Sequence, residues 1–421
     1  MPDTVVHTDL DLDFVRSQFP AFSAPSLRGQ GFFENAGGSY ACAQVIDLLA
    51  EFYRETKVQP FGLYEASRRG GAAMEAAQTR LASLMGVAPD WVQFGPSTTA
   101  NAYVLAQAVG ETLAPGDAVI VTDQDHEANS GPWRRLAARG VTIREWRMDP
   151  GTGHLDPEML WDLIDDRVRL VAFPHCSNVV AEVNPVAEIC QRLRAEGILT
   201  CVDGVAHAPH GLPDPGHLGA DIYLFSTYKT FGPHQGVMVI DPDLAMRLPN
   251  QGHDFNAALV GKRLTPAGPD HAQIAACAGI VAYYEALHAH HFGAGAIPTT
   301  PTQQRMRVNA LIKAHECALL QRLLDALATR PEFRLLGPGD AACRAPTVAL
   351  AHATPGRVLA SDLAQHGIMA GGGSFYANRA IARLGVAPEH GVLRLSFLHY
   401  TTRAELDRLI DALDRIASAA R

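Results

Sequence analysis

Short apolar runs alternate with amphipathic segments through the middle of the chain, and this alternation predicts an α/β fold. The five clearest strand candidates are Ala118–Thr122, Val168–Phe173, Ile198–Val202, Ile222–Phe225 and Val237–Ile240. Amphipathic stretches such as Pro157–Ile164 and Val186–Glu196 lie between them, as expected of helices that connect parallel strands. The pattern therefore predicts a sheet whose strands are mostly parallel, built into a large domain.

The pattern changes in the last third of the chain. An apolar-rich helix is predicted from about Ala272 to about Ala289, and the Gly/Pro-rich segment Gly293–Pro301 after it marks a boundary. The order beyond the boundary is helix, strands, helix, which indicates a smaller α+β domain. Its last helix is predicted at Arg403–Ala419, with Thr402 as the N-cap candidate. We divide the chain into an N-terminal arm (1–30) that packs with the small domain, a large domain (31–295) and a small C-terminal domain (296–421).

Composition narrows the class of protein. The chain of 421 residues has 35 Lys and Arg against 44 Asp and Glu, a net charge of −9, which argues against nucleic acid or an anionic membrane as partner. No apolar stretch is long enough to span a bilayer, and the acidic, polar start at Met1–Phe14 is unlike a signal peptide. The seven cysteines are scattered without a C-x-x-C pair, so we expect reduced thiols and a cytoplasmic protein.

Polar side chains that could take part in catalysis or binding follow the predicted strands. Asp203 follows Ile198–Val202, Lys229 follows Ile222–Phe225, and Asp125 and His126 follow the strand at 118–122. Asn178 closes the segment after the strand at 168–173. The carboxyl ends of strands form the binding crevice of an open α/β sheet, so we expect these side chains to gather at one edge.

Lys229 is unusual because lysines are rare here: they occur only at positions 57, 229, 262 and 313. An amine can lose its proton and attack a carbonyl, which a guanidinium cannot. Alone, Lys229 would more often be a surface lysine, and Asp203 would as often be a turn or capping residue. Together they meet the needs of pyridoxal 5′-phosphate (PLP), namely a lysine for the Schiff base and an acid that keeps the pyridine nitrogen protonated.

The segment Gly95–Asn101, with its hydroxyl side chains, precedes a helical stretch. Free backbone amides and hydroxyls at a helix N-terminus suit a phosphate group. An ordinary capping segment has the same composition, so both interpretations stay open at this point.

Four separate motifs in order resemble the class V aminotransferase and cysteine desulfurase family of fold-type I PLP enzymes. Ser226–Pro233 resembles its Ser-x-His-Lys-x-x-Gly-Pro motif, and Val202–His210 is similar to its Asp-Gly-Ala-Gln-x-x-x-His motif. Asp125–Asn129 followed by Pro132-Trp133, and Ser177–Val179 followed by Asn184-Pro185, resemble two more. The resemblance covers about Phe32 to about Ile410, and it implies an α/β fold with a seven-stranded, mostly parallel sheet and a small α+β domain.

The resemblance implies a role for each matching residue. Lys229 would form the Schiff base and later shuttle protons, Asp203 would pair with the pyridine nitrogen, and His126 would stack on the ring. Asn178 would lie near the 3′ oxygen of the cofactor, and Arg394 would bind the substrate carboxylate. The phosphate would be held by Thr98, Thr99, Ser226 and Tyr228, and the substrate would also meet Asn35 and Tyr376.

The chain departs from the family in three places. Tyr376 stands where cysteine desulfurases carry their nucleophilic Cys, on the segment Gly371–Tyr376, and Cys343 is the nearest cysteine along the chain. Ala206 replaces a Gln, and His207 beside it could take over at the 3′ oxygen or simply pack. Tyr228 replaces a His but can still donate to phosphate. The glycines 371–373 suit either a mobile loop over the substrate or a tight turn.

A persulfide relay needs a thiolate, so the expected activity is that of a cysteine desulfurase-like enzyme without one. We expect β-elimination on an amino acid, of the carbon–sulfur lyase type, with an aminotransferase or an amino-acid epimerase as alternatives. A non-catalytic PLP-fold protein used in binding or assembly is the alternative of another class. The fold also implies a homodimer, with 268–271 near the second subunit. No acidic residue or Cys stands at metal-ligand spacing from His288, His290 and His291, so we expect a surface or packing role there and no metal.

Overall fold

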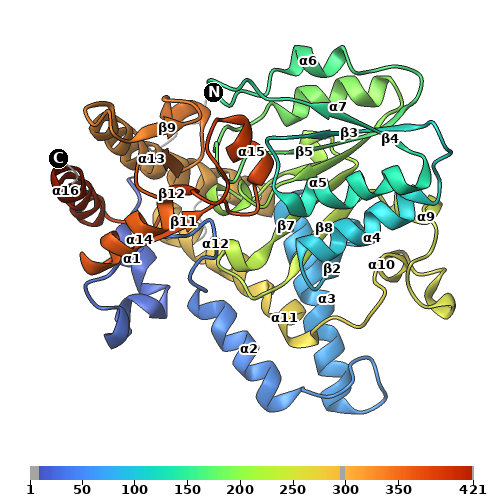
Figure 1. Ribbon diagram of the computed structural model, residues 1–421. Helices are drawn as coiled ribbons and strands as arrows, with labels where there is room; N and C mark the ends of the chain where they lie inside the picture. Colours follow the sequence, from blue (N-terminus) through green and yellow to red (C-terminus); the bar gives the residue numbers. More distant parts are fainter. Residues whose placement is uncertain (1–8, 294–298, 420–421) are drawn as a thin grey trace, which may run out of the picture.

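The computed structural model describes residues 9–293 and 299–419, and a seven-stranded sheet forms its larger part (Figure 1). The strand order is β2-β8-β7-β6-β5-β3-β4, and all neighbours are parallel except β8, which runs antiparallel to both β2 and β7. Its strands are β2 (Val92–Gly95), β3 (Ala118–Thr122), β4 (Thr142–Trp146), β5 (Val168–Pro174), β6 (Leu199–Asp203), β7 (Ile222–Ser226) and β8 (Gly236–Ile240). The predicted, mostly parallel sheet is therefore confirmed.

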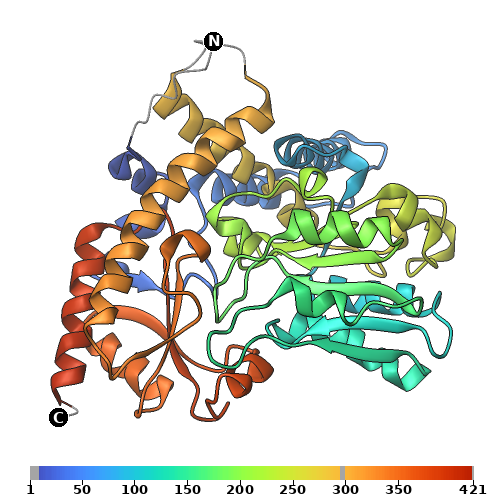
Figure 2. The ribbon, with the colours of Figure 1, turned by 90° about the horizontal axis from the view of Figure 1, so that it is seen from above.

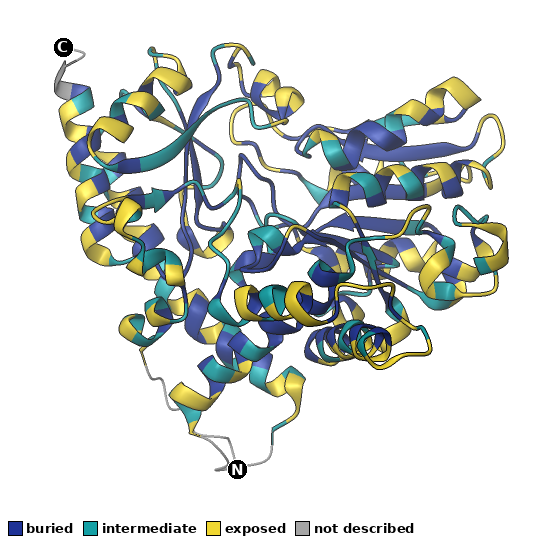
Figure 3. Ribbon diagram, turned by 90° about the horizontal axis from the view of Figure 1, so that it is seen from below, coloured by how far each residue is buried: buried dark blue, intermediate teal, exposed yellow. Residues whose placement is uncertain are grey.

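The strands of the large sheet are mostly apolar, as expected where helices cover both faces of a sheet. Every residue of β3, β7 and β8 is buried, as expected of strands with two covered faces. The surrounding helices keep their exposed residues on the outside (Figure 3). They are α2 (Ala43–Glu55), α3 (Glu65–Met85), α4 (Thr98–Gly110), α5 (Glu127–Arg134), α6 (Pro157–Trp161), α7 (Val186–Ala195), α8 (Pro215–Leu218), α9 (Pro242–Arg247), α10 (Val260–Arg263), α11 (His271–Ala276) and α12 (Ala278–Phe292).

The single helix predicted over 272–289 is wrong, because α11 and α12 are separate and meet at Cys277. The amide of Cys277 donates to the carbonyl of Ile274 at 3.1 Å, three residues back. The Cys277 thiol donates instead to the carbonyl of Gln273 at 3.3 Å, the acceptor that a continuous helix would give to the amide. Hydrophobic periodicity does not indicate where a side chain will donate a hydrogen bond to a backbone carbonyl and interrupt the helix.

A five-stranded sheet lies beside the larger one (Figure 2). Its order is β1-β11-β12-β10-β9, antiparallel except for the parallel pair β1–β11. The strands are β1 (Gly31–Phe33), β9 (Arg334–Leu336), β10 (Thr347–Ala351), β11 (Ile368–Gly373) and β12 (Val392–Ser396), and the helices of this part are α13 (Pro301–Ala328), α14 (Gly356–Gln365), α15 (Asn378–Arg383) and α16 (Arg403–Ala419). Leu320, Leu323 and Leu350 belong to a separate apolar core here. The domain limits stay a prediction, and β1 joins the smaller sheet.

The N-cap predicted for the last helix can be compared with the structure. The amide of Glu405 donates to Thr402 Oγ1 at 3.1 Å and the amide of Thr402 donates to Glu405 Oε2 at 2.8 Å. This reciprocal capping box confirms Thr402 as the N-cap of α16. The boundary predicted at Gly293–Pro301 falls largely on 294–298, outside the described residues, as do residues 1–8 of the N-terminal segment.

The N-terminal helix α1 (Leu12–Ser17) ties the two ends of the chain together. Arg16 forms an ion pair with Glu405 on α16 at 3.0 Å and donates to the carbonyl of Tyr400 at 2.8 Å. The His290 ring stacks on Phe14 with centroids 3.8 Å apart, so histidines of the α12 cluster pack on the arm. Within the described residues, no helix has both the length and the apolar character needed to cross a membrane.

Candidate active site

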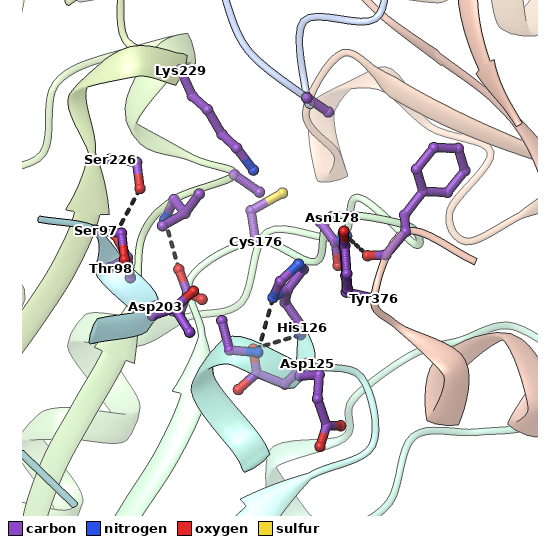
Figure 4. A pocket seen from close by; sticks show the side chains of 18 of the residues that line it. Ser97, Thr98, Asp125, His126, Cys176, Asn178, Asp203, Ser226, Lys229 and Tyr376 are labelled. Atoms are coloured by element: carbon purple, nitrogen blue, oxygen red, sulfur yellow. Dashed lines mark hydrogen bonds between the residues drawn. The ribbon is translucent and has the colours of Figure 1, made fainter. Parts of the chain in front are cut away.

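A pocket of about 470 Å³ lies where the carboxyl ends of the large sheet face the smaller sheet (Figure 4). The large part contributes the ends of β6 and β7 and the starts of α4 and α5. The smaller part contributes β12 and the segment after β11. The predicted residues that line it are Thr98, Thr99, His126, Asn178, Asp203, Ser226, Tyr228, Lys229, Tyr376 and Arg394. The topology therefore brings together most of the side chains that the sequence singled out.

Lys229 ends a single 3-10 turn (Thr227–Lys229) directly after β7, and its amine points into the pocket (Figure 4). Within the described residues, no hydrogen bond or ion pair holds this amine. Burial, followed by the nearby charge of Arg394, lowers the pKa of Lys229 to about 8, although Asp203 and Glu34 oppose the shift. A lysine with this pKa is partly neutral near physiological pH, so it can act as a nucleophile or a base.

Asp203 is the last residue of β6, the strand that pairs with β7. Its carboxylate accepts a hydrogen bond from the amide of Val205 at 2.8 Å. Burial raises the pKa of Asp203 to about 6, against the opposing effects of that amide and of Lys229. Asp125 lies in the same pocket, and burial followed by repulsion from Asp203 raises its pKa well above the usual value. Burial therefore opposes the ionisation of both carboxyls, and Asp203, with a pKa of about 6, can still carry a negative charge near neutral pH.

His126 caps the start of α5 with its ring. Its Nδ1 accepts a hydrogen bond from the amide of Ala128 at 3.0 Å, which places the ring proton on Nε2. Burial, followed by the charges of Lys229 and Arg394, lowers the pKa of His126 to about 3. The imidazole is therefore neutral, and its ring lies 5.5 Å from that of Tyr376. A neutral, fixed ring at the pocket wall is suited to stacking against an aromatic ligand.

Hydroxyl groups and a helix N-terminus meet at one corner of the pocket. The hydroxyls of Thr98 and Ser226 lie 2.8 Å apart, and Thr98 begins α4. The first amides of a helix lack partners within the helix, so this corner can bind an anion. Tyr228 lines the same pocket and stacks on His234 with centroids 4.7 Å apart. A Cβ on Gly236 would lie 2.4 Å from the Ser97 carbonyl carbon, so glycine lets β8 approach this corner.

Asn178 connects the two parts of the molecule across the pocket. Its Nδ2 donates to the carbonyl of Phe375 at 3.0 Å, and its own carbonyl accepts from Arg394 at 3.3 Å. The side-chain Oδ1 of Asn178 is buried without a hydrogen-bond partner in the described structure. A buried acceptor without a partner is costly, so a ligand that donates a hydrogen bond here would be favoured.

Arg394 on β12 is buried and already has a carboxylate partner. Its Nη2 lies 2.7 Å from Glu34 Oε1, and its guanidinium carbon lies 3.8 Å from the centre of the Phe375 ring. Glu34 follows β1 and was not among the predicted site residues. The only feature of the sequence that could have indicated Glu34 as a site residue is its charged side chain, next to Asn35, within the apolar segment 31–36. No periodicity could indicate a pairing between positions 360 residues apart.

Two predicted site residues, Asn35 and His207, do not line the pocket and have structural roles. Asn35 Nδ2 donates to the carbonyls of Ser396 at 3.1 Å and Phe32 at 3.2 Å, and its Oδ1 accepts from the Tyr400 hydroxyl. The side chain of Asn35 therefore fixes the segment that carries Glu34, and Asn35 is absent from the pocket lining.

The His207 ring stacks on His175 with centroids 3.7 Å apart and also does not line the pocket, whereas Ala206 does. Burial lowers the pKa of His207 well below the usual value. His207 is therefore a packed, neutral histidine in this structure.

The glycines 371–373 form the end of β11, so the expectation of a loop or tight turn at these positions is wrong. Gly371 pairs with Arg394 across the β11–β12 ladder, and a Cβ on Gly372 would lie 2.2 Å from the carbonyl oxygen of Gly356. Close backbone approach explains these glycines. The connection begins only after them, where Phe375 and Tyr376 both have left-handed backbones, and the Tyr376 side chain is 76% exposed at the pocket mouth.

Cys176 is a pocket residue that the sequence did not indicate, because it lies far along the chain from the segment Gly371–Tyr376, to which Cys343 is nearest. The Cys176 thiol lines the pocket and donates to the carbonyl of Ala181 at 3.3 Å (Figure 4). Burial raises the pKa of Cys176 to about 12, so the thiol is protonated at neutral pH. It does not supply the thiolate that Tyr376 replaces. Over the described ranges, no cluster of three or more His, Cys, Asp or Glu side chains could hold a metal ion.

The chain matches the class-V aminotransferase family over residues 31–255 and 303–409. An aminotransferase-like protein of Gibberella zeae, FGM3, is 33% identical over 97% of this chain and 99% of its own length. A probable cysteine desulfurase of Pseudomonas aeruginosa is 32% identical over 95% of this chain and 97% of its own.

Two solved cysteine desulfurases share the fold. CsdA of Escherichia coli aligns with a TM-score of 0.80 at 23% identity, covering 98% of this chain and 100% of its own. The enzyme of Thermococcus onnurineus NA1 aligns with a TM-score of 0.82 at 22% identity, covering 97% and 98%. The architecture is thus the fold-type I architecture of PLP enzymes. By fold, by family match and by full-length relatives, the chain belongs to the class-V aminotransferase family of PLP-dependent enzymes.

Proposed function

We propose that Lys229 holds PLP covalently and that the enzyme acts at the α-carbon of an amino acid. The observation that carries this proposal is an amine without a partner, with a pKa of about 8, beside a buried carboxylate on the neighbouring strand. The remaining groups fit the same ligand: a helix N-terminus with hydroxyls for the phosphate, Asp203 for the ring nitrogen and Asn178 near the 3′ oxygen. Bound there, PLP would supply an electron sink for negative charge at the substrate α-carbon.

Each side chain around the site has a separate role in the proposed reaction. Lys229 is positioned to take the α-proton because its amine is partly neutral near pH 8. Asp203 keeps the ring nitrogen protonated, and neutral His126 covers the ring without competing for that proton. Arg394 receives the substrate carboxylate at the face formed by the smaller sheet. Tyr376, at the mouth, is the exposed side chain that a substrate passes.

We propose β-elimination, of the carbon–sulfur lyase type, as the outcome. Among the described residues that line the pocket there is no thiolate, since Tyr376 replaces the loop cysteine and the Cys176 thiol has a pKa of about 12. Without a sulfur acceptor on the protein, the leaving group departs into solution. The second candidate is an aminotransferase, which the full-length aminotransferase-like relative favours.

A panel of amino acids tested on the PLP-loaded enzyme separates these outcomes. A lyase releases a keto acid and ammonia from one substrate, whereas an aminotransferase also requires a keto-acid acceptor. Loss of optical activity without a new product would indicate an epimerase. Release of alanine together with sulfide from free cysteine, in place of a keto acid and ammonia, would indicate a desulfurase and would contradict the roles given to Tyr376 and Cys176.

We also propose a homodimer. The tip formed by α2 and α3 exposes large apolar side chains, including Phe61 at 56% and Leu63 at 94%, which is unusual for a free surface. Tyr53 on this tip bonds to Asp270 at 3.1 Å, so the 268–271 segment lies beside it. A cytoplasmic location is supported by the seven cysteines, all of them free thiols. Mass measurement in solution by light scattering tests the dimer, and a monomer would contradict it.

A further inference from the structure

The guanidinium of Arg394 is neutralised by a carboxylate of the same chain. Its side chain is only 4% exposed, and Glu34 Oε1 lies 2.7 Å from Nη2. The other contacts of the guanidinium are a carbonyl, that of Asn178, and the Phe375 ring. A buried cation without a counter-ion is strongly destabilising, so Glu34 compensates Arg394 in the ligand-free protein.

The fold contains a niche for this carboxylate. A Cβ on Gly371 would lie 2.1 Å from Glu34 Oε2, and a Cβ on Gly37 would lie 2.9 Å from Glu34 Oε1. Gly371 pairs with Arg394 across the sheet, so the niche and the guanidinium are adjacent. The backbone of Gly371 is not left-handed. Glycine at 371 therefore leaves room for the carboxylate and is not required by the backbone.

The ion pair between Glu34 and Arg394 does not use all the hydrogen-bonding atoms of the two side chains. One nitrogen and one oxygen form the contact, whereas Glu34 Oε2 and Arg394 Nε are both buried without a hydrogen-bond partner in the described structure. A bidentate arrangement would have satisfied both atoms. The Glu34 side chain is 28% exposed and lines the pocket, so it can rotate out while Arg394 stays in place.

We propose that Glu34 determines specificity by occupying the carboxylate site at Arg394 until an amino-acid substrate displaces it. This inference rests on the proposed role of Arg394. A simple carboxylate exchanges one ion pair for another and gains little, so the site excludes it. An amino acid also reacts at Lys229, and that added binding free energy compensates for the displaced Glu34.

The test is a calorimetric titration of the PLP-loaded enzyme with propionate, which has a carboxylate but no amine, and with propionamide, which is uncharged. Glu34→Gln should tighten propionate binding by about tenfold or more, because a competing anion is removed. Propionamide binding should change by less than about twofold. Arg394→Gln in the Glu34→Gln background should abolish the gain.

Gly371→Ala provides an independent variant, since its methyl group would push the Glu34 carboxylate from the niche. It should also tighten propionate binding, although less than Glu34→Gln. Glu127→Gln is the matched control, because Glu127 lines the same pocket but faces Arg379, at 3.6 Å. Its effect should stay below about threefold.

Unchanged or weaker propionate binding in both Glu34→Gln and Gly371→Ala would overturn the inference. A protein that takes up no PLP would instead overturn the proposed function, so the two failures are distinguishable. Thermal unfolding of each variant, monitored by circular dichroism, verifies that the titrated protein is folded.

Discussion

The two walls of the pocket differ in how they are built. The wall from the large sheet consists of residues that directly follow strands or begin helices, such as Asp203, Lys229 and Thr98. The wall from the smaller sheet depends on contacts between distant segments, such as Glu34 with Arg394 and Asn178 with Phe375. We expect the first wall to hold the cofactor and the second wall to select the substrate. The comparison predicts that variants of the two walls will fail in different ways.

The largest effect is expected on the cofactor wall. Lys229→Ala should lower turnover by about 10³-fold or more, because it removes both the nucleophile and the base. The measurement is product release from the PLP-loaded protein under saturating substrate. Lys313→Ala, at an exposed position on α13, is the matched control and should leave turnover unchanged. Equal loss in both variants would contradict a special role for Lys229.

Arg394→Gln should have the next largest effect, confined to the substrate wall. The KM for an amino acid should rise by about 10²-fold while PLP still binds, because a charged donor to the carboxylate is lost. Steady-state kinetics combined with a PLP titration separates the two quantities. If PLP affinity falls as far as substrate affinity, the two walls are not independent.

The pH dependence of cofactor uptake tests the pKa of Lys229 on the cofactor wall. The neutral form of Lys229 is the reactive one, and burial lowers its pKa to about 8. The rate at which the cofactor-free protein takes up PLP should therefore rise with pH and level off above about 8. Below that value it should fall by about tenfold per pH unit. A midpoint near 10.5 would show that the lysine is solvated like an ordinary one.

The smallest effect is expected at Cys176, where the two walls meet. Its thiol is buried, with a pKa of about 12, and donates to a backbone carbonyl. Cys176→Ala should change turnover by less than about threefold and lower the free energy of unfolding by about 1 kcal/mol. Turnover and urea unfolding check the two values. A loss of turnover above about 100-fold would mean that this thiol takes part in the reaction.

Features that depend on residues close together along the chain could be predicted from the sequence. The five strands named from apolar runs all lie in the large sheet, and polar residues that follow them line the pocket, since apolar runs and the strand-end rule are both local. The strands β2 and β4 of the same sheet were not predicted. Glu34 was missed because its partner lies in a distant strand, and His207 was placed at the pocket although its ring packs on His175. The glycines of β11 were assigned to a loop because composition does not show that they pair with β12.

The central claim is that Lys229 is the covalent anchor of PLP. Its most direct test is reduction of the PLP-loaded protein with borohydride, which makes a lysine–cofactor bond permanent, followed by peptide mass spectrometry. The account predicts loss of the visible absorbance band and the added mass of the reduced cofactor on the peptide that contains Lys229. No visible band, or the added mass on Lys57, Lys262 or Lys313 instead, would contradict it.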